Sequence, residues 1–89
     1  MINRFDEMVL LKICRKTNMS PHSHVPAEAF KRGFPGKEDR AQDSLEKLIK
    51  LGYVQRHPTR GGMTYQISKE GRDLCRTLKE KGPSELSLP

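Results

Sequence analysis

Residues 53–67 have the pattern of a β-hairpin, and this pattern limits the possible folds more than any other feature. Two runs with β-branched and aromatic residues, 53–57 and 63–67, flank a turn sequence, 58–62, with two consecutive glycines. Glycine pairs tolerate the positive φ angles that such turns need. The apolar residues expected on one face of the hairpin are Val54, Tyr65 and Ile67. Because alternate residues of a strand point to the same side, we expect that face to pack on helices, which predicts an α+β fold.

Two helical patterns precede the hairpin in the first third of the chain. Residues 4–16 have Asn3 as the expected N-cap, acids in the first turn and apolar residues on nearly all sides. Residues 26–32 follow as a second helix, and Pro26 suits its first position. Gly33 is expected to end this helix in a left-handed conformation, which costs glycine least.

Two further helical patterns flank the hairpin directly. Residues 37–51 form the first, and Gly52 is expected to stop it. Its inward stripe is expected to be Ala41, Leu45 and Leu48, flanked by Ser44 and Ile49. Ser68 is expected to cap the last helix, which runs to about residue 81. A very short strand is expected at residues 24–25, in the connection that precedes the second helix.

The size and charge of the chain restrict its class. Its 89 residues suffice for one domain, expected at residues 1–82, with residues 83–89 as a flexible tail. With 17 Lys and Arg against 11 Asp and Glu, the net charge is +6, which favours an acidic polymer as partner.

The chain lacks the sequence patterns of a membrane span and of a secretion signal. Cys14 and Cys75 fall within helical patterns and are expected to be packed, reduced thiols, with redox sensing as the alternative. We therefore expect a cytoplasmic protein. A transporter, a disulfide-stapled secreted protein and a large multidomain enzyme are excluded on these grounds.

The expected order is helix, short strand, helix, helix, two-stranded ribbon and helix. This is the arrangement of a winged helix-turn-helix, in which the hairpin is the wing. Residues 45–54, LEKLIKLGYV, resemble the motif L-x-x-L-x-x-x-G-[hydrophobic]-[Val/Ile] that ends a recognition helix and enters the wing. Residues 65–74, YQISKEGRDL, are similar to the motif Y-x-L-T-x-x-G-R-x-L that leads from the wing into the last helix.

Both motifs recur in the MarR, PadR and related small prokaryotic winged-helix regulators, compact archaeal ones included. The resemblance covers residues 4 to about 81. It implies a three-helix core, a two-stranded β-wing and a C-terminal helix, and it implies a DNA-binding transcriptional regulator.

Two glycines in these motifs have physical reasons that do not depend on the resemblance. Gly52 allows the sharp change of direction from helix to ribbon. Gly71 costs the last helix about 1 kcal/mol of helix propensity, so its presence indicates a close approach to a neighbouring element.

The wing is the strongest functional signal in the sequence. Residues 47–69 contain five cations and no Asp or Glu. The cations are Lys47, Lys50, Arg56, Arg60 and Lys69. They predict an edge that faces phosphates, with Arg60 at a tip that can enter a minor groove. The alternative is a solvated hairpin with ordinary surface charge.

The outward face of the third helix is expected to read bases. It carries Asp39, Arg40, Asp43, Lys47 and Lys50, with Lys37 and Gln42 at its edges. Arg40 suits guanine, Gln42 suits adenine, and Asp43 can accept a hydrogen bond from cytosine N4. However, the acids Glu38, Asp39 and Asp43 would repel phosphates. The alternative is a helix surface with local pairs such as Asp43 with Lys47.

No pattern indicates catalysis, a cofactor or a metal site. The sequence has no phosphate-binding glycine loop, no dinucleotide-binding motif, no HExxH, and no Ser or Cys with an evident base. His22 and His24 alternate, but no third ligand with metal-site spacing accompanies them. We therefore expect a protein that is not an enzyme.

The prediction is a transcriptional regulator that binds double-stranded DNA, and the DNA-binding residues are expected to be Lys37, Arg40, Gln42, Asp43, Lys47, Lys50, Arg56 and Arg60. The third helix would enter the major groove, and the wing would contact phosphates or the minor groove. The rival is a winged-helix module that binds proteins of the transcription machinery. RNA binding is disfavoured because the wing has no exposed aromatic platform for bases.

A homodimer is expected from the apolar residues that encircle the first helix. Leu10, Leu11 and Cys14 would form an exposed apolar strip unless another element covers them. A two-fold dimer through the first or last helix would cover the strip and set two recognition helices about one DNA turn apart. The alternative is that the last helix covers the strip within the same chain, through Leu74, Cys75 and Leu78.

Overall fold

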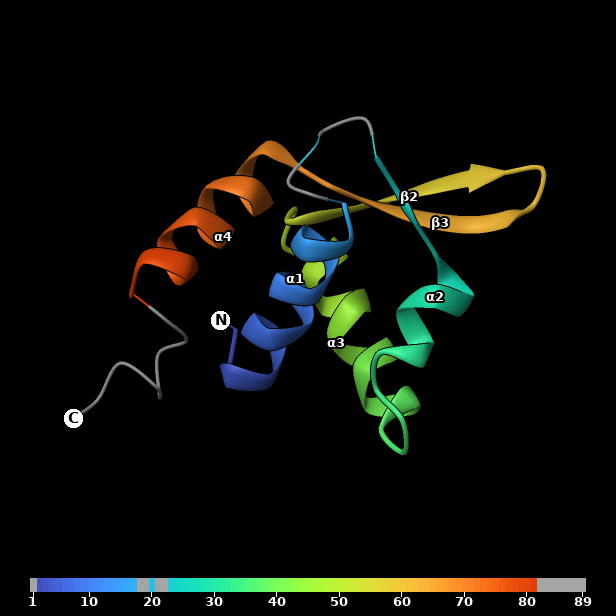
Figure 1. The fold of residues 1–89 in the computed structure, drawn as a ribbon, viewed down its shortest axis with the longest axis horizontal. Helices are drawn as coiled ribbons and strands as arrows, with labels where there is room; N and C mark the ends of the chain where they lie inside the picture. Colours follow the sequence, from blue (N-terminus) through green and yellow to red (C-terminus); the bar gives the residue numbers. More distant parts are fainter. Residues whose placement is uncertain (1, 18–19, 21–22, 82–89) are drawn as a thin grey trace.

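The chain folds into four helices and a small antiparallel sheet of three strands (Figure 1). The computed structural model describes residues 2–17, 20 and 23–81, and the expected tail lies outside them. In chain order the elements are α1 (Arg4–Lys16), β1 (Val25–Pro26), α2 (Ala27–Arg32), α3 (Glu38–Lys50), β2 (Val54–Thr59), β3 (Gly62–Ile67) and α4 (Lys69–Lys81). This architecture confirms the predicted α+β class.

Helix α1 begins and ends where the sequence predicts. Asn3 caps it as expected: its Oδ1 accepts a hydrogen bond from the Asp6 backbone N–H at 2.9 Å. Asp6 returns a bond, because its Oδ2 accepts from the Asn3 backbone N–H at 3.0 Å. This reciprocal capping box satisfies two backbone donors that the first turn of a helix leaves without partners.

The segment around α2 corrects three details of the prediction. The short strand is Val25–Pro26 and not residues 24–25, so Pro26 ends the strand and is the N-cap of α2 rather than its first residue. Gly33 ends α2 in a right-handed conformation, with φ −75°, because the turn continues through a bond from the Phe34 N–H to the Lys31 carbonyl. The left-handed position falls at Gly36, with φ +77°.

Helix α3 is one residue shorter at each end than predicted. Lys37 is its N-cap and Leu51 its C-cap, and Gly52 follows with φ +86°, which confirms Gly52 as the stop. The predicted inward stripe is confirmed, since Ala41, Leu45 and Leu48 are fully buried.

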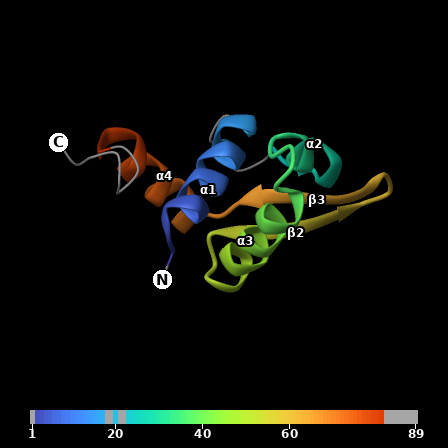
Figure 2. The ribbon, with the colours of Figure 1, turned by 90° about the horizontal axis from the view of Figure 1, so that it is seen from below.

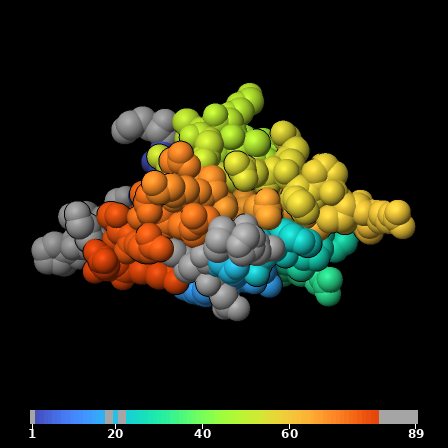
Figure 3. Space-filling view, turned by 90° about the horizontal axis from the view of Figure 1, so that it is seen from above, coloured from blue at the N-terminus to red at the C-terminus, as the bar shows by residue number. Residues whose placement is uncertain are grey.

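The hairpin is longer than predicted, and its turn is shorter. Strands β2 and β3 pair from Val54 with Ile67 to Thr59 with Gly62, so the turn is formed at residues 60–61. Gly62 has φ +126°, whereas Gly61 needs no positive φ. β1 pairs with the other edge of β3, which gives the sheet order β1-β3-β2. The hairpin extends as a narrow arm beyond the helices (Figures 1 and 3).

The core lies between one face of the sheet and helices α1, α2 and α3, and α4 closes it on the outer side of α1 (Figures 1 and 2). The predicted apolar face of the hairpin is confirmed, because Val54, Tyr65 and Ile67 are buried in this core. The remaining buried apolar side chains of the core are Val9, Leu10, Ile13, Cys14, Val25, Phe30, Ala41, Leu45, Leu48, Cys75 and Leu78.

The corner between the hairpin and α4 explains Ser68 and Gly71. The Ser68 Oγ accepts a bond from the Gly71 N–H at 3.0 Å and donates one to the Gly52 carbonyl at 2.6 Å. This confirms Ser68 as the cap of α4. A Cβ on Gly71 would lie 2.2 Å from the Tyr53 carbonyl oxygen, which no contact in a protein tolerates. The close approach predicted for Gly71 is therefore confirmed.

Cys14 and Cys75 are packed as predicted, but they are not reduced. Both are fully buried, and they form a disulfide that joins α1 to α4 across 61 residues of sequence. The prediction of free thiols was wrong because the helical patterns placed each cysteine on a buried face without showing that the two faces meet. With this disulfide, the two cysteines neither indicate a reducing compartment nor exclude a disulfide-stapled protein.

Two of the three residues of the apolar strip that led us to expect a dimer are covered within the chain. Leu10 and Cys14 are fully buried, and Cys75 and Leu78 of α4, which packs along α1, belong to the same core. The expectation of an exposed strip was therefore wrong for these two, while Leu11 is half-buried and lines a surface groove. Among the described residues, no helix is both long enough and apolar enough to cross a membrane.

Candidate nucleic-acid interface

The structure does not bring the predicted DNA-binding residues together at one place. Helix α3 lies against β2, so the third helix and the hairpin do form one side of the molecule (Figure 2). On this side, Lys47 forms an ion pair with a residue of α1. Both Gln42 and Arg56 contact Glu46. Lys37 and Arg40 lie next to α1. The exposed Asp43, Lys50 and Arg60 complete the predicted set.

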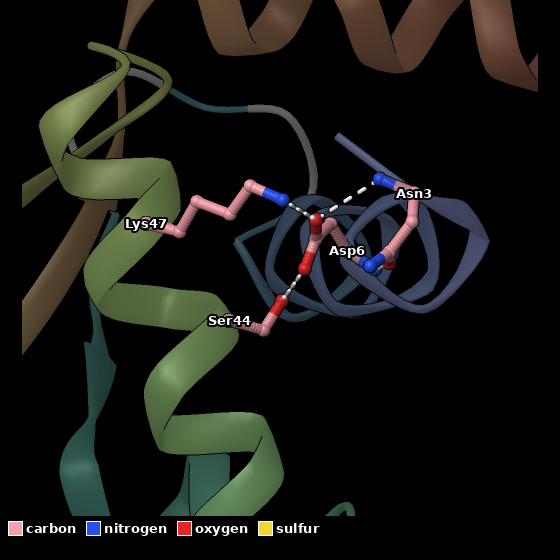
Figure 4. Close-up of polar contacts among 4 residues, drawn as sticks. All are labelled: Asn3, Asp6, Ser44 and Lys47. Atoms are coloured by element: carbon pink, nitrogen blue, oxygen red, sulfur yellow. Dashed lines mark hydrogen bonds and ion pairs between the residues drawn. The ribbon is translucent and has the colours of Figure 1, made fainter. Parts of the chain in front are cut away.

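Lys47 is held by a buried carboxylate that the sequence analysis did not pair with it. The Asp6 Oδ2 accepts a hydrogen bond from the Lys47 Nζ at 2.8 Å, and its Oδ1 accepts one from the Ser44 Oγ at 2.6 Å (Figure 4). The Asp6 side chain is 5% exposed and the Lys47 side chain 40%. Asp6 therefore caps α1 and joins α1 to α3 at the same time.

The protonation of Asp6 follows from these contacts. Burial by itself raises the pKa of its carboxyl, since it disfavours the charged form. The hydrogen bonds from Lys47, Ser44 and the Asn3 backbone, together with the charge of Lys47, outweigh burial and hold the pKa below its ordinary value. Asp6 is therefore ionised at neutral pH, and its ion pair keeps Lys47 close to α1.

Glu46 is a second acceptor, on the side of α3 that faces the hairpin. Its Oε2 accepts a bond from the Gln42 Nε2 at 3.0 Å, and its Oε1 forms an ion pair with Arg56 of β2. The side chains of Arg56 and Glu46 are 48% and 40% exposed. Such exposed pairs contribute at most about 1 kcal/mol, so this contact orients Arg56 without fixing it.

Arg40 and Lys37 lie at the N-terminal end of α3, next to α1. The Arg40 guanidinium lies over the Phe5 ring, 4.2 Å from its centroid, in cation–π geometry. Lys37 is exposed and lines the same hollow as Phe5 and Arg40. Base reading by Arg40 and Gln42 stays a prediction, and it requires each to leave its present partner.

The outermost stripe of α3 is more acidic than the sequence analysis assumed. Residues 39, 43, 46 and 50 follow one another at helical spacing, opposite the buried stripe of α3. They are Asp39, Asp43, Glu46 and Lys50, three acids and one base. Arg40 and Lys47 lie toward α1, so they flank this stripe instead of forming its centre.

The tip of the hairpin presents Arg60 to solvent. Within the described part of the chain, neither Arg60 nor Lys50 forms an ion pair or hydrogen bond through its side chain. The Thr59 Oγ1 donates to the Gly62 carbonyl at 2.9 Å and closes the turn around Arg60. Arg60 and Lys50 are thus predicted phosphate contacts whose side chains are available in the present structure.

The sequence held one usable signal for Asp6. On a helical wheel, Asp6 falls between Ile13 and Leu10, within the arc that is buried in α1. An acid in a buried arc requires a partner, and Lys47 and Ser44 are one turn apart on the helix that packs there. No comparable signal identified Glu46, because an exposed acid on a helix surface needs no explanation.

No group of three His, Cys, Asp or Glu side chains comes together as a metal site among the described residues. His22 lies outside the described residues, while the His24 ring lies 4.8 Å from the His57 ring. The chain was also compared with protein-family models, curated proteins and solved structures, and nothing matched.

Proposed function

We propose that the chain is a winged-helix transcriptional regulator that binds double-stranded DNA, with the β2–β3 hairpin as its wing. The observation that carries the proposal is the projecting hairpin with Arg60 exposed at its tip, beside α3, in a stretch of residues 47–69 that contains no acid. In this proposal α2 lies across the backbone, α3 enters the major groove and the wing contacts phosphates or the minor groove. Under this proposal the chain works in the compartment that holds the DNA, the cytoplasm of a prokaryote, and the buried Cys14–Cys75 disulfide would have to persist there against reduction.

The contacts of α3 and the hairpin suggest which residues would bind phosphates and which would discriminate between bases. Arg60 and Lys50 are available for phosphates at once, and Arg56 becomes available when it leaves Glu46. The acids Asp39, Asp43 and Glu46 oppose close approach of phosphates to the middle of α3. We therefore expect the wing to provide most of the affinity for DNA. The acids of α3 would discriminate between bases by accepting hydrogen bonds from the N4 amino group of cytosine.

The salt dependence of binding tests this proposal. Arg60→Ala should flatten the plot of log K against log salt concentration by about one unit, because each neutralised phosphate contributes about 0.9 to the slope. Sequence preference should hardly change. Fluorescence anisotropy with a labelled duplex at several salt concentrations measures both. Lys79→Ala, an exposed cation of α4 away from the hairpin, is the matched control and should leave the slope unchanged.

The second candidate is a winged-helix module that binds protein. The acidic outermost stripe of α3, with Asp39, Asp43 and Glu46, favours it, because this stripe would complement a basic partner surface. The same anisotropy experiment separates the two functions: no duplex binding at low salt rejects the DNA proposal and leaves the protein-binding module.

A further inference from the structure

A groove between α1 and the turn from α2 to α3 has no role in the proposed DNA contacts of the wing. Its volume is about 560 Å³, and its floor is formed by Phe5, Met8 and Leu11 of α1 together with Phe34 of the turn. Helix α4 and the sheet lie on other sides of α1, so neither covers this floor. The groove is therefore a surface of the folded chain and not a gap within its core.

The floor is apolar and accessible. Met8 is 46% exposed, although its neighbours Val9 and Leu10 are fully buried. The Phe34 ring is packed between two others, with its centroid 5.9 Å from that of Phe5 and 5.4 Å from that of Phe30. The floor thus combines a rigid aromatic part, anchored in the core, with an adaptable methionine, which suits contact with apolar side chains.

The charged residues that line the groove are all cations. Lys12, Arg15 and Lys37 line it, and the Lys12 Nζ lies 5.7 Å from the centroid of the Phe34 ring. The hollow next to it, around the N-terminal end of α1, adds Arg4 and Arg40. Among the described residues that line these two hollows there is no acid. This surface is therefore more uniformly basic than the outermost stripe of α3.

We propose that this groove docks an acidic amphipathic helix of a partner protein. From Phe5 to Arg15 it follows nearly three turns of α1, about 15 Å, which matches two to three turns of a docked helix. Apolar residues of that helix at positions i, i+3 or i+4 and i+7 would contact Met8 and the aromatic floor. Glu or Asp residues on its flanks would meet the cations of the rim.

Charge and shape favour an acidic helix over three other occupants, namely a second copy of this chain, a nucleic acid and a lipid surface. The exposed face of α4 mixes Glu70, Asp73 and Glu80 with Lys69, Arg76 and Lys79, so a second copy of this chain offers no acidic, apolar helix there. Phosphates of a nucleic acid would pair with the rim but would leave Met8 and Leu11 without apolar contacts. The floor is recessed between two elements, whereas a lipid surface favours apolar side chains that protrude.

The test uses the full chain and a designed probe. The probe is a synthetic 16-residue peptide with Leu on one helical face and Glu on both flanks. An NMR titration of the isotope-labelled protein should shift the amide signals of residues 5–15 and 33–37 saturably, and leave those of the hairpin in place. A scrambled peptide of the same composition and a version with Lys in place of Glu should not bind.

Two variants locate the contact. Met8→Glu should weaken probe binding by at least about tenfold, since it places an acid in the apolar floor at a half-exposed position that does not hold the fold together. Thr77→Glu introduces the same acid at an exposed, neutral position of α4 and should leave binding unaltered. The amide spectrum of each free variant verifies that it is folded.

Several outcomes would overturn the proposal. Equal binding of the scrambled peptide, or no effect of Met8→Glu, would reduce the groove to nonspecific charge attraction. Hairpin signals that shift with the probe would place the site elsewhere. Vesicles of phosphatidylglycerol, or a short DNA duplex, that displace the probe and shift the same groove signals more strongly would assign the surface to lipid or to nucleic acid. Probe binding in the groove does not involve Arg60. The groove proposal can therefore be rejected while the proposed DNA binding still holds.

Discussion

The contact between α1 and α4 and the contact between α3 and β2 hold the molecule together in opposite ways. Helix α4 is joined to α1 by a disulfide between two fully buried cysteines. β2 shares the apolar core with α3 through Val54, and its polar side-chain contact with α3 is the Arg56–Glu46 ion pair, in which both side chains are 40% or more exposed. A covalent, buried contact does not respond to solvent, whereas an exposed ion pair exchanges readily with water and salt.

The contact between α1 and α3 is intermediate, because a buried carboxylate, Asp6, faces a cation that is partly exposed, Lys47. Among the contacts that join different elements, burial therefore decreases from α4 toward the hairpin. The end of the molecule that we propose to contact DNA is the one where the ion pair between elements is the more exposed. Three predictions test this gradient.

The largest effect is expected at the disulfide. Replacement of both cysteines by alanine should lower the free energy of unfolding by about 4 kcal/mol, the value that chain entropy assigns to a cross-link over this span. Thermal unfolding followed by circular dichroism measures it. A reducing agent should destabilise the unaltered protein and leave the double variant as it is. Two reactive thiols in the folded, unreduced protein would contradict the assignment.

A smaller effect is expected at Asp6. Asp6→Asn should cost about 1–3 kcal/mol, because the buried position loses its charge-assisted bonds to Lys47 and Ser44. Lys47 is partly exposed and regains water, which keeps the loss below that of a fully buried pair. Chemical denaturation at neutral pH measures the difference. Asp73→Asn, at the exposed pair with Arg76, is the matched control and should change stability by well under 1 kcal/mol.

The pH dependence of this difference has a definite sign. The folded pKa of Asp6 lies below its ordinary value, so its contribution is complete above about pH 4 and is lost as the pH falls through the folded pKa. The difference in the free energy of unfolding between the unaltered protein and Asp6→Asn should therefore be largest near neutral pH and should decrease in acid. A difference that increases in acid would show that the hydrogen bonds to Asp6 do not stabilise its ionised carboxylate.

The smallest effect on stability is expected at Glu46. Glu46→Gln should change the free energy of unfolding by no more than about 0.5 kcal/mol, since the pair with Arg56 is exposed. Under the proposed function it should strengthen duplex binding and steepen its salt dependence by about one unit, because Arg56 is released and an acid is removed. Glu80→Gln on α4 controls for the change in net charge. Equal gains in both variants would mean that Arg56 does not contact phosphate.

The parts of the fold that were predictable depend on residues close together in the chain. Asn3 and Asp6 lie three residues apart, and their exchange of hydrogen bonds marks the start of α1. Ser68 marks the start of α4 in the same manner. Gly33 shows the limit of such local rules: glycine is typical at a helix end, but whether it takes the left-handed conformation depends on how the following turn is closed.

The candidate site was predictable in its composition and not in its pairing. The cations of α3 and the hairpin are evident from the sequence, yet two of them, Lys47 and Arg56, have acidic partners in the structure. Lys12 and Arg15 were not proposed as functional residues, although helical spacing places them on the same face of α1 as Met8 and Leu11. The groove exists only because Phe34 lies beside that stripe, and nothing within α1 indicates this.

The sequence by itself determined the elements of this protein, their caps and their buried faces, because helix and strand periodicities and capping act within a few residues. The tertiary structure decided which faces meet. It paired Asp6 with Lys47 across 41 residues and Cys14 with Cys75 across 61, and it placed α4 over part of the strip of α1 that otherwise predicted a dimer. The physical reason is that burial, ion pairing and disulfide formation depend on distances between remote residues, and the order of residues in the chain does not specify these distances until the elements have packed.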